Sequence, residues 1–416
     1  MERTIFYEQV RDRLLRYARV DTQSARESDT VPTTRKQFDL AYMLRNELKE
    51  MGASEVWLDE RACVLYAAVP ATASQGMAFG LVTHMDTAPD APGGPCRPWV
   101  LTDYDGGDIL LNAEQGIVMS PDEFPNLKNY IGQDLILTDG TTLLGGDDKA
   151  AVAAVMTMAE HLLTHPELPH GPVALAFTPD EEVGGLARDL DLDRFGARVA
   201  YTLDGAYLGY YEDETFNASH ATVVFTGRSV HTGTAKGILV NAADMAAEFV
   251  NLLPPLEKPQ FTEGREGFFH LVSIRANVER AQVDLIVRDH DPDIFAGREQ
   301  LLRDLAVRMV EKYGPERVAL TVTPTYRNMK EVVDNYPFLI DNLKQAIALA
   351  GLTPQSIAFR GGTDGSALSH RGLPCPNLSA GYENAHGRFE YVPIRSMEKN
   401  VEILLHLVRL FGAMEA

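Results

Sequence analysis

The chain has 416 residues, 45% of them hydrophobic, which allows roughly two or three domains with a sizeable buried core and excludes general disorder. Its formal net charge of −21 disfavours nucleic acid and anionic membrane surfaces as partners, because both would repel it. Three widely spaced cysteines, Cys63, Cys96 and Cys375, form no pair motif, which favours a reducing, cytoplasmic compartment without a disulfide framework.

The first part of the chain alternates helical and strand patterns. The N-terminal segment mixes charged and apolar residues as an amphipathic helix does, unlike the apolar centre of a signal peptide. An uncharged stretch at 62–85 is broken by Pro70 into two short apolar runs, so we expect strands rather than a membrane span. We expect helices at about 4–19 and 35–51, and strands at about 55–58, 63–69 and 77–83.

A turn-rich segment follows at 88–129, where no strong periodicity is visible. Its length predicts either a surface excursion or part of a site. Beyond it, the pattern predicts a helix from Asp147 to about 163 and strands at 173–178 and 199–203. This alternation predicts an α/β fold in which helices sandwich a mixed sheet.

The pattern changes near residue 214. The next elements are expected in the order βαββαβ, which is typical of a ferredoxin-like unit: 221–226, 240–253, 269–277, 281–288, 293–313 and 317–323. The earlier alternation resumes after about 328, with a helix at 335–350, an apolar run before Arg360 and a final helix at 394–412. We therefore predict one α/β domain, 1–213 and 328–416, interrupted by an inserted domain, 214–327.

A histidine and an acid lie together at the end of one apolar strand. His84 and Asp86 are two residues apart, so in a strand their side chains share a face. Asp86 can then hold one imidazole N–H of His84 and leave the other ring nitrogen for a metal. Taken alone, the pair is a weak signal and is more typical of a surface loop.

Further acids occur at other strand and helix ends. Asp147 and Asp148 precede a helix, where carboxylates either cap the helix or bind a ligand. The three acids from Asp180 to Glu182 repel one another unless a cation is near, and one glutamate can bind metal while the other acts as a base. Five residues form a mixed set of imidazole and carboxylate groups. Such a set suits two zinc ions that share one carboxylate, and it consists of His84, Asp147, Glu182, Asp204 and His386.

Several motifs of the chain resemble the peptidase T group of tripeptide aminopeptidases, within the two-zinc aminoacylase and dipeptidase family of metallohydrolases. The similar segments run in order over nearly the whole chain: HMDTAPD (84–90), GGDDKA (145–150), FTPDEEVG (177–184), TLDG (202–205), HTGTAKG (231–237), RDHD (288–291), RGGTDGS (360–366), LPCPN (373–377) and ENAHGRFEYV (383–392). The resemblance implies a zinc-exopeptidase-like catalytic domain and makes the inserted ferredoxin-like domain a lid.

The resemblance also implies individual roles. One zinc would be held by His84, Asp147 and Asp204, and the second by Asp147, Glu182 and His386, so that Asp147 bridges the two ions. Asp86 would orient His84, and Glu181 would be the general base. An aspartate at the position of Asp204 accompanies aminopeptidases among such enzymes, whereas a glutamate accompanies carboxypeptidases.

Substrate contacts are implied for three residues around the lid. His231 would approach the scissile carbonyl and Arg288 the C-terminal carboxylate, with Arg360 a further candidate for that carboxylate because an arginine fork matches it in two places. A surface arginine or a histidine without catalytic duty is the alternative for each. Glu383 departs from the family pattern and is expected to add a carboxylate near the second zinc, which bears on tripeptide preference.

The predicted function is a cytoplasmic two-zinc aminopeptidase that releases the N-terminal residue of tripeptides in peptide catabolism. One alternative is a related two-zinc dipeptidase or N-acyl amino acid amidohydrolase. Another is a peptide-binding protein that has lost its chemistry, which the intact ligand set and Glu181 disfavour. Because lids mediate dimers among such enzymes, a homodimer is a further expectation.

Overall fold

The computed structural model describes residues 3–415, which form two compact units. The first unit contains the chain up to Asp213 together with Glu331–Ile357 and the chain from Thr363 onward; the second contains Glu214–Lys330 and Ala358–Gly362. The first break lies where the sequence predicted it, after residue 213. The second break lies three residues beyond the predicted 327, and the short segment 358–362 returns to the second unit, which the prediction had not included.

An eight-stranded sheet forms the centre of the first unit. Its strands follow the spatial order β1 (Ser54–Asp59), β2 (Val64–Val69), β8 (Val173–Thr178), β3 (Phe79–His84), β9 (Ala200–Gly205), β16 (Asn377–Ser379), β10 (Tyr210–Thr215) and β15 (Gln355–Phe359). The sheet is mixed: β3 runs parallel to β8 and β9, whereas β2 runs antiparallel to β1 and β8. The predicted mixed sheet of an α/β fold is thereby confirmed.

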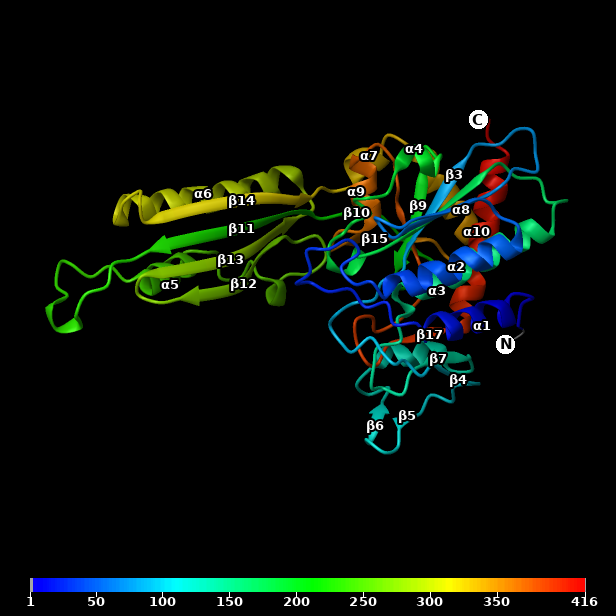
Figure 1. Cartoon of the computed structure of the whole chain (residues 1–416), viewed down its shortest axis with the longest axis horizontal. Coiled ribbons are helices and arrows are strands. Elements are labelled where there is room, and N and C mark those ends of the chain that lie inside the picture. The colour runs from blue at the N-terminus through cyan, green and yellow to red at the C-terminus, as the bar shows by residue number, and fades with distance from the viewer. Residues whose placement is uncertain (1–2, 416) are drawn as a thin grey trace. The chain divides into compact units, whose positions relative to one another are not determined.

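The central strands are buried along their whole length because both faces of the sheet are covered. Every residue of β3 and β8 is buried. One face packs against five helices that share the main core: α1 (Tyr7–Tyr17), α2 (Gln37–Met51), α3 (Gly146–Thr164), α8 (Pro337–Leu349) and α10 (Ile394–Gly412). These helices lie beside the sheet in Figure 1. Phe411 of α10 stacks on Phe79 of β3 with ring centroids 4.4 Å apart.

The opposite face carries a smaller apolar cluster under α4 (Leu192–Phe195) and α9 (Asp364–His370). Here Phe195 lies so close to β3 that a Cβ atom at Gly80 would be 2.2 Å from its ring. A glycine is therefore needed at this position for α4 to pack against the sheet.

The turn-rich segment contains more regular structure than the sequence predicted. Short strands lie at β4 (Trp99–Leu101), β5 (Ile109–Asn112), β6 (Ile117–Met119) and β7 (Leu135–Leu137), with a 3-10 helix, η1 (Pro125–Tyr130). β7 pairs with β4 and with β17 (Tyr391–Pro393), while β5 and β6 form a hairpin, coloured cyan in Figure 1. These strands are missed by periodicity because three or four residues are too few to show alternation.

The second unit is a four-stranded antiparallel sheet covered by two helices. In spatial order its strands are β12 (Phe268–Ala276), β13 (Arg280–Asp289), β11 (Asn217–Thr226) and β14 (Val318–Tyr326), and its helices are α5 (Ala242–Asn251) and α6 (Pro292–Tyr313). The chain order is βαββαβ, as the sequence predicted. Both helices share one apolar core with the sheet.

The remaining short elements are η2 (Glu181–Val183), η3 (Thr232–Thr234), η4 (Pro259–Phe261) and α7 (Lys330–Val333). Between residues 3 and 415, no helix combines the length and the apolar character needed to cross a membrane.

Candidate metal centre

The five predicted ligands come from strand ends, a helix start and one loop of the first unit. His84 is the last residue of β3, and Asp204 lies near the end of the neighbouring, parallel strand β9. Asp147 lies in the first turn of α3, Glu182 in η2 directly after β8, and His386 in the loop before β17. The carboxyl ends of parallel strands meet at one sheet edge, which is where open α/β sheets bind ligands.

A first group of potential ligand atoms surrounds His84, whose side chain is buried. Its Nε2 atom lies 3.0 Å from Asp147 Oδ1 and 3.4 Å from Asp204 Oδ1. The hydroxyl of Tyr382 donates a hydrogen bond of 3.3 Å to Asp204 Oδ1, a contact that the sequence did not indicate. His84, Asp147 and Asp204 each offer an atom within 4.8 Å of the others.

A second group shares Asp147 with the first. His386 Nε2 lies 2.8 Å from Glu182 Oε2 and 3.3 Å from Asp147 Oδ2. Asp147, Glu182 and His386 also place one potential ligand atom each within 4.8 Å of the others. The two oxygens of Asp147 therefore face different groups, which is the arrangement expected of a carboxylate that bridges two metal ions.

Asp86 is fully buried and connects His84 with the loop that bears the two glutamates. Its Oδ1 atom lies 3.4 Å from His84 Nδ1, so the ring nitrogen that faces Asp147 is the other one. The same carboxylate accepts the backbone N–H groups of Glu181 at 3.0 Å and of Glu182 at 3.3 Å. The geometry predicted for Asp86 beside His84 is present, and the contacts to Glu181 and Glu182 are additional.

Asp180 anchors the glutamate loop from its other side, a role that the sequence did not reveal. Its carboxylate accepts hydrogen bonds from the backbone N–H of Thr33 at 2.8 Å and from Gln37 Nε2 at 2.6 Å. The backbone of Asp180 adopts a positive φ of 61°, which a non-glycine residue adopts only when its surroundings hold it there. The acid run at 180–182 therefore divides: Asp180 anchors the loop, Glu182 contacts His386, and Glu181 experiences the charges of Asp204 and Glu182.

Glu390 is a second residue missed by the sequence. Its buried carboxylate accepts backbone N–H groups from the turn that leads into Asp147, and the peptide bond between Asp147 and Asp148 is cis. Burial raises the pKa of Glu390 to about 7. The only signal in the sequence was a further acid four residues after His386.

The crowding of acids at this sheet edge shifts most of their pKa values upward. Burial raises the pKa of Glu181 well above its usual range, raises that of Glu182 to about 8 and also raises that of Asp204. Asp147 is the exception: burial acts to raise its pKa, but hydrogen bonds with His386 and His84 outweigh this and lower it. Hydrogen bonds to Asp147 and Glu182 raise the pKa of His386 to about 11.

These groups fit a pair of divalent cations. Glu182 Oε1 is buried and has no hydrogen-bond partner in the structure, although its neighbouring oxygen contacts His386. A buried carboxylate oxygen without a donor is costly unless a cation faces it. The donor set combines imidazole nitrogens and carboxylate oxygens, which is typical of zinc sites in hydrolases.

Glu383 does not lie in either group, so the expectation of an added carboxylate near the second metal was wrong. Its carboxylate accepts a hydrogen bond of 2.7 Å from Asn126 Nδ2 and another from the hydroxyl of Tyr130. Both partners belong to η1. Glu383 therefore ties its loop to the small sheet region instead of facing the metal ligands.

The predicted substrate-binding residues belong to the second unit. His231 is exposed and its Nδ1 atom accepts the backbone N–H of Gly233 at 3.1 Å, which leaves Nε2 free to donate. Arg288 donates from Nη1 to the carbonyl of Arg360 at 3.1 Å, and its Nε is buried without a hydrogen-bond partner. The contacts of His231 and Arg288 therefore leave each of them able to bind a substrate group.

Arg360 departs from its prediction as a carboxylate-binding residue. Its two terminal nitrogens donate to the carbonyl oxygens of Thr262, Gly264 and Glu266 and to the hydroxyl of Thr262. The guanidinium also lies over the rings of Phe216 and Phe268. Four hydrogen bonds occupy the fork that a substrate carboxylate would need, so Arg360 instead joins the segment 358–362 to the loop at 262–266.

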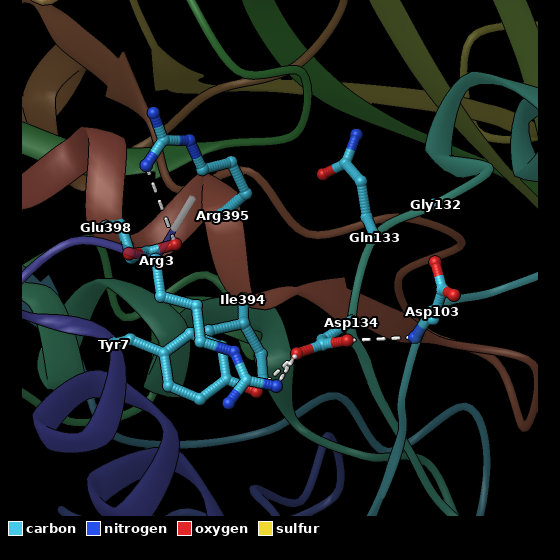
Figure 2. Close-up of a pocket in the computed structure, with 9 residues that line it drawn as sticks. All are labelled: Arg3, Tyr7, Asp103, Gly132, Gln133, Asp134, Ile394, Arg395 and Glu398. Carbon is cyan, nitrogen blue, oxygen red and sulfur yellow. Dashed lines mark hydrogen bonds and ion pairs between the residues drawn. The ribbon is translucent and has the colours of Figure 1, made fainter. Parts of the chain in front are cut away.

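A separate polar cleft of about 270 Å³ in the first unit contains none of the candidate ligands (Figure 2). In Figure 2, Arg3 and Tyr7 on one side and the backbone of Asp103 on the other converge on the carboxylate of Asp134. Arg3 pairs with Asp134 at 2.8 Å and Arg395 lies 3.8 Å from Glu398, and we assign no ligand to the cleft.

Comparison with known proteins places the chain in a family. The model of the peptidase family M20/M25/M40 matches residues 144–410. The chain belongs to this peptidase family. The enzyme named Peptidase T from Geobacillus thermodenitrificans is 45% identical over 401 residues, which are 96% of this M20 peptidase and 97% of that relative. Peptidase T from Clostridium botulinum is 45% identical over 403 residues, 97% and 99% of the two chains.

Solved structures share the fold of the M20 peptidase. Aminopeptidase PepT from Bacillus cereus has a TM-score of 0.75 at 21% identity, covering 97% of this chain and 98% of that one. A tripeptidase from Staphylococcus aureus has a TM-score of 0.78 at 21% identity, covering 98% and 99%. A Bacillus subtilis protein described as a dinuclear metal-binding peptidase of the M20 family has a TM-score of 0.66 at 12% identity, covering 97% and 98%. The resemblance to peptidase T predicted from the motifs is confirmed.

Proposed function

We propose that this M20 peptidase is a two-zinc aminopeptidase that releases the N-terminal residue of tripeptides. The observation that carries the proposal is the placement of Asp147, whose two oxygens face His84 and His386 respectively. The similarity to enzymes named Peptidase T over nearly the whole chain supports the substrate class.

His84, Asp147 and Asp204 would hold one zinc ion, and Asp147, Glu182 and His386 the other. When bound, such a pair lowers the pKa of a shared water and polarises the carbonyl of the scissile peptide bond. Asp86 keeps His84 oriented through its Nδ1 side, and it fixes the backbone from which Glu181 and Glu182 extend.

Glu181 would be the general base. It lies outside both ligand groups, directly before Glu182, and its carboxylate experiences the charges of Asp204 and Glu182. It would accept the proton of the attacking water and return it to the amine that leaves when the peptide bond breaks. This division leaves Glu182 as a ligand and Glu181 as the proton carrier.

Two residues of the second unit would read the substrate. Because His231 accepts a hydrogen bond at Nδ1, its neutral ring carries the proton on Nε2, where it can donate to the scissile carbonyl oxygen. Arg288 would bind the C-terminal carboxylate, which its unpartnered Nε supports. Arg360 is not included, because its fork is already occupied.

We further propose that the enzyme acts in the cytoplasm on short peptides and that it forms a homodimer through the second unit. All three cysteines are buried as free thiols, which supports a reducing compartment. The dimer rests on the resemblance alone.

A substrate panel tests the proposal. The zinc-loaded enzyme would be assayed with a free-amine tripeptide, the same tripeptide N-acetylated, a dipeptide and an N-acyl amino acid. The tripeptide is expected to give the highest kcat/KM, and acetylation is expected to lower it at least about 100-fold, because an aminopeptidase recognises the free N-terminal amine and acetylation removes its charge. Preference for the N-acyl substrate would establish the amidohydrolase alternative instead, and preference for the dipeptide would establish a dipeptidase.

A further inference from the structure

Glu390 clamps the turn that carries the shared carboxylate. Its side chain is buried, and Oε2 accepts the backbone N–H groups of Leu144 at 3.0 Å and Gly145 at 2.7 Å. Its Oε1 atom accepts the backbone N–H of Asp147 at 2.8 Å. Three backbone donors of one turn therefore converge on one carboxylate that lies 243 positions away in the chain.

The turn is shaped to receive this side chain. A Cβ atom at Gly146 would lie 2.5 Å from Val392 Cγ2 and 3.1 Å from Glu390 Oε1. Since a real Cβ does not approach a carbon atom that closely, a glycine is required for the turn to dock against Glu390 and β17.

The same loop also supplies a predicted ligand. Backbone hydrogen bonds between Glu383 and Tyr391, of 2.9 and 3.1 Å, close the loop, and His386 lies within it. Glu390 is the last loop residue before β17. One loop thus contributes a ligand to the second metal group and a clamp to the turn that holds the shared ligand.

We propose that Glu390 is a positioning residue that fixes the carboxylate of Asp147 between the two metal groups, so that both metal sites depend on a side chain that is not a ligand. Glu390 belongs to neither ligand group, and both of its oxygens already accept N–H donors. Holding the Asp147 backbone sets where its Oδ1 and Oδ2 atoms lie relative to His84 and His386. The inference rests on the proposed two-metal function.

Glu390→Gln tests the inference, with Glu383→Gln as its matched control. A glutamine keeps the size of Glu390 but turns an NH2 group toward at least one of the N–H donors. Glu383 is a buried carboxylate of the same loop, but it is bound by Asn126 and Tyr130 and not by the turn at 144–147.

Zinc affinity would be measured by calorimetric titration against a competing chelator, without substrate. We expect Glu390→Gln to lower the affinity of both zinc ions by about 10- to 100-fold, because Asp147 serves both, while Glu383→Gln keeps the wild-type affinities. His386→Ala provides the comparison in which only one of the two binding steps is weakened. A loss confined to one step in Glu390→Gln would show that Glu390 supports the His386 loop, and would overturn the proposal.

Hydrogen–deuterium exchange of the metal-free proteins gives a second readout. The peptide covering residues 143–149 is expected to exchange faster in Glu390→Gln than in the wild type and Glu383→Gln, because its amides lose their acceptor. If Glu390→Gln does not fold, Glu390→Asp keeps both oxygens at a shorter reach and should show the same losses to a smaller degree. If Glu383→Gln and Glu390→Gln lose zinc affinity and amide protection equally, or if both behave as the wild type does, the positioning role of Glu390 is wrong. A wild type that binds fewer than two zinc ions would instead overturn the two-metal function.

Discussion

Adjacent acids in this peptidase have different contacts because the backbone directs their side chains to different partners. Asp180 turns toward Thr33 and Gln37, whereas Glu182 turns toward His386. Glu181 lies between them and belongs to neither arrangement. Residue type alone therefore does not distinguish the three acids of this run. They are distinguished by the hydrogen bonds that Asp86 and Asp180 accept from the surrounding backbone and side chains.

Glu181→Gln should separate metal binding from catalysis. The amide keeps the size of the side chain but cannot carry a proton from water to the leaving amine, so we expect kcat to fall by about 10²- to 10⁴-fold. Both zinc ions should remain bound, because Glu181 lies outside the ligand groups. Atomic absorption and steady-state kinetics measure the two properties, and Glu182→Gln serves as the control that loses metal. Wild-type turnover in Glu181→Gln would contradict its assignment as the base.

Arg288 and Arg360 are expected to respond differently to replacement by lysine. A lysine ammonium cannot reproduce the four hydrogen bonds of the Arg360 guanidinium, so Arg360→Lys should lower the unfolding free energy of the second unit by about 1 kcal/mol. Arg288→Lys should raise KM for a tripeptide but not for the same tripeptide with a C-terminal amide, because only the former presents a carboxylate.

Denaturant unfolding and kinetics on the two substrates distinguish these roles. A selective rise in KM for the free carboxylate in Arg360→Lys would restore the role first predicted for Arg360. An unchanged KM for both substrates in Arg288→Lys would remove Arg288 from the carboxylate site.

Long elements were predictable from the sequence because their apolar pattern persists over several turns or alternations. The strand at 173–178 and the helix at 394–412 were placed at the observed residues of β8 and α10. The strands β16 and β17 were not found, since three residues carry no readable period.

The sequence indicated candidate ligands, which the structure brings together in two groups, and missed the acids that bind backbone N–H groups. The ligand set consists of residue types that bind metals, placed at strand and helix ends. Glu390 and Asp180 instead receive N–H groups from distant turns, and any residue except proline supplies such a donor. No pattern of residue types could therefore have indicated these contacts. The fork of Arg360 was misassigned for the same reason, because carbonyl oxygens occupy it.

Three helices of the first unit are joined by ion pairs, which predicts a pH dependence at the scale of elements. Glu47 of α2 accepts hydrogen bonds of 2.8 Å from both Arg13 and Tyr17 of α1, and Arg13 also contacts Glu160 of α3 at 2.9 Å. Burial acts to raise the pKa of Glu47, but the charge of Arg13 and these hydrogen bonds outweigh it, so the pKa is lowered from its usual value of 4.5.

A carboxylate whose folded pKa lies below its unfolded pKa stabilises the fold above the unfolded value, and this contribution is lost as pH falls through the folded pKa. Glu47→Gln should therefore be less stable than the wild type at pH 7, and the difference should shrink as pH falls below 4.5. Urea unfolding at a series of pH values measures it. A difference that stays constant down to pH 3 would show that lost packing, not the charge, is responsible.

At the scale of the whole molecule, the chemistry and the predicted substrate contacts are divided between the two units. All residues of both metal groups belong to the first unit, whereas His231, Arg288 and Arg360 belong to the second. Each unit has its own apolar core. Metal binding should therefore stabilise one unit selectively.

Removal of metal is expected to shift only one of two unfolding transitions. A ligand that binds the folded state stabilises it by about 2.7 kcal/mol when its free concentration is 100 times Kd, so saturating zinc should raise the Tm of the first unit by several degrees. The Tm of the second unit, which contributes no ligand, should stay constant. Scanning calorimetry with zinc and with a chelator measures both transitions, and Asp147→Ala, which removes the shared ligand, should resemble the chelated wild type. If both transitions shift by the same amount on chelation, the two units unfold as one and the assignment of zinc stabilisation to the first unit alone is wrong.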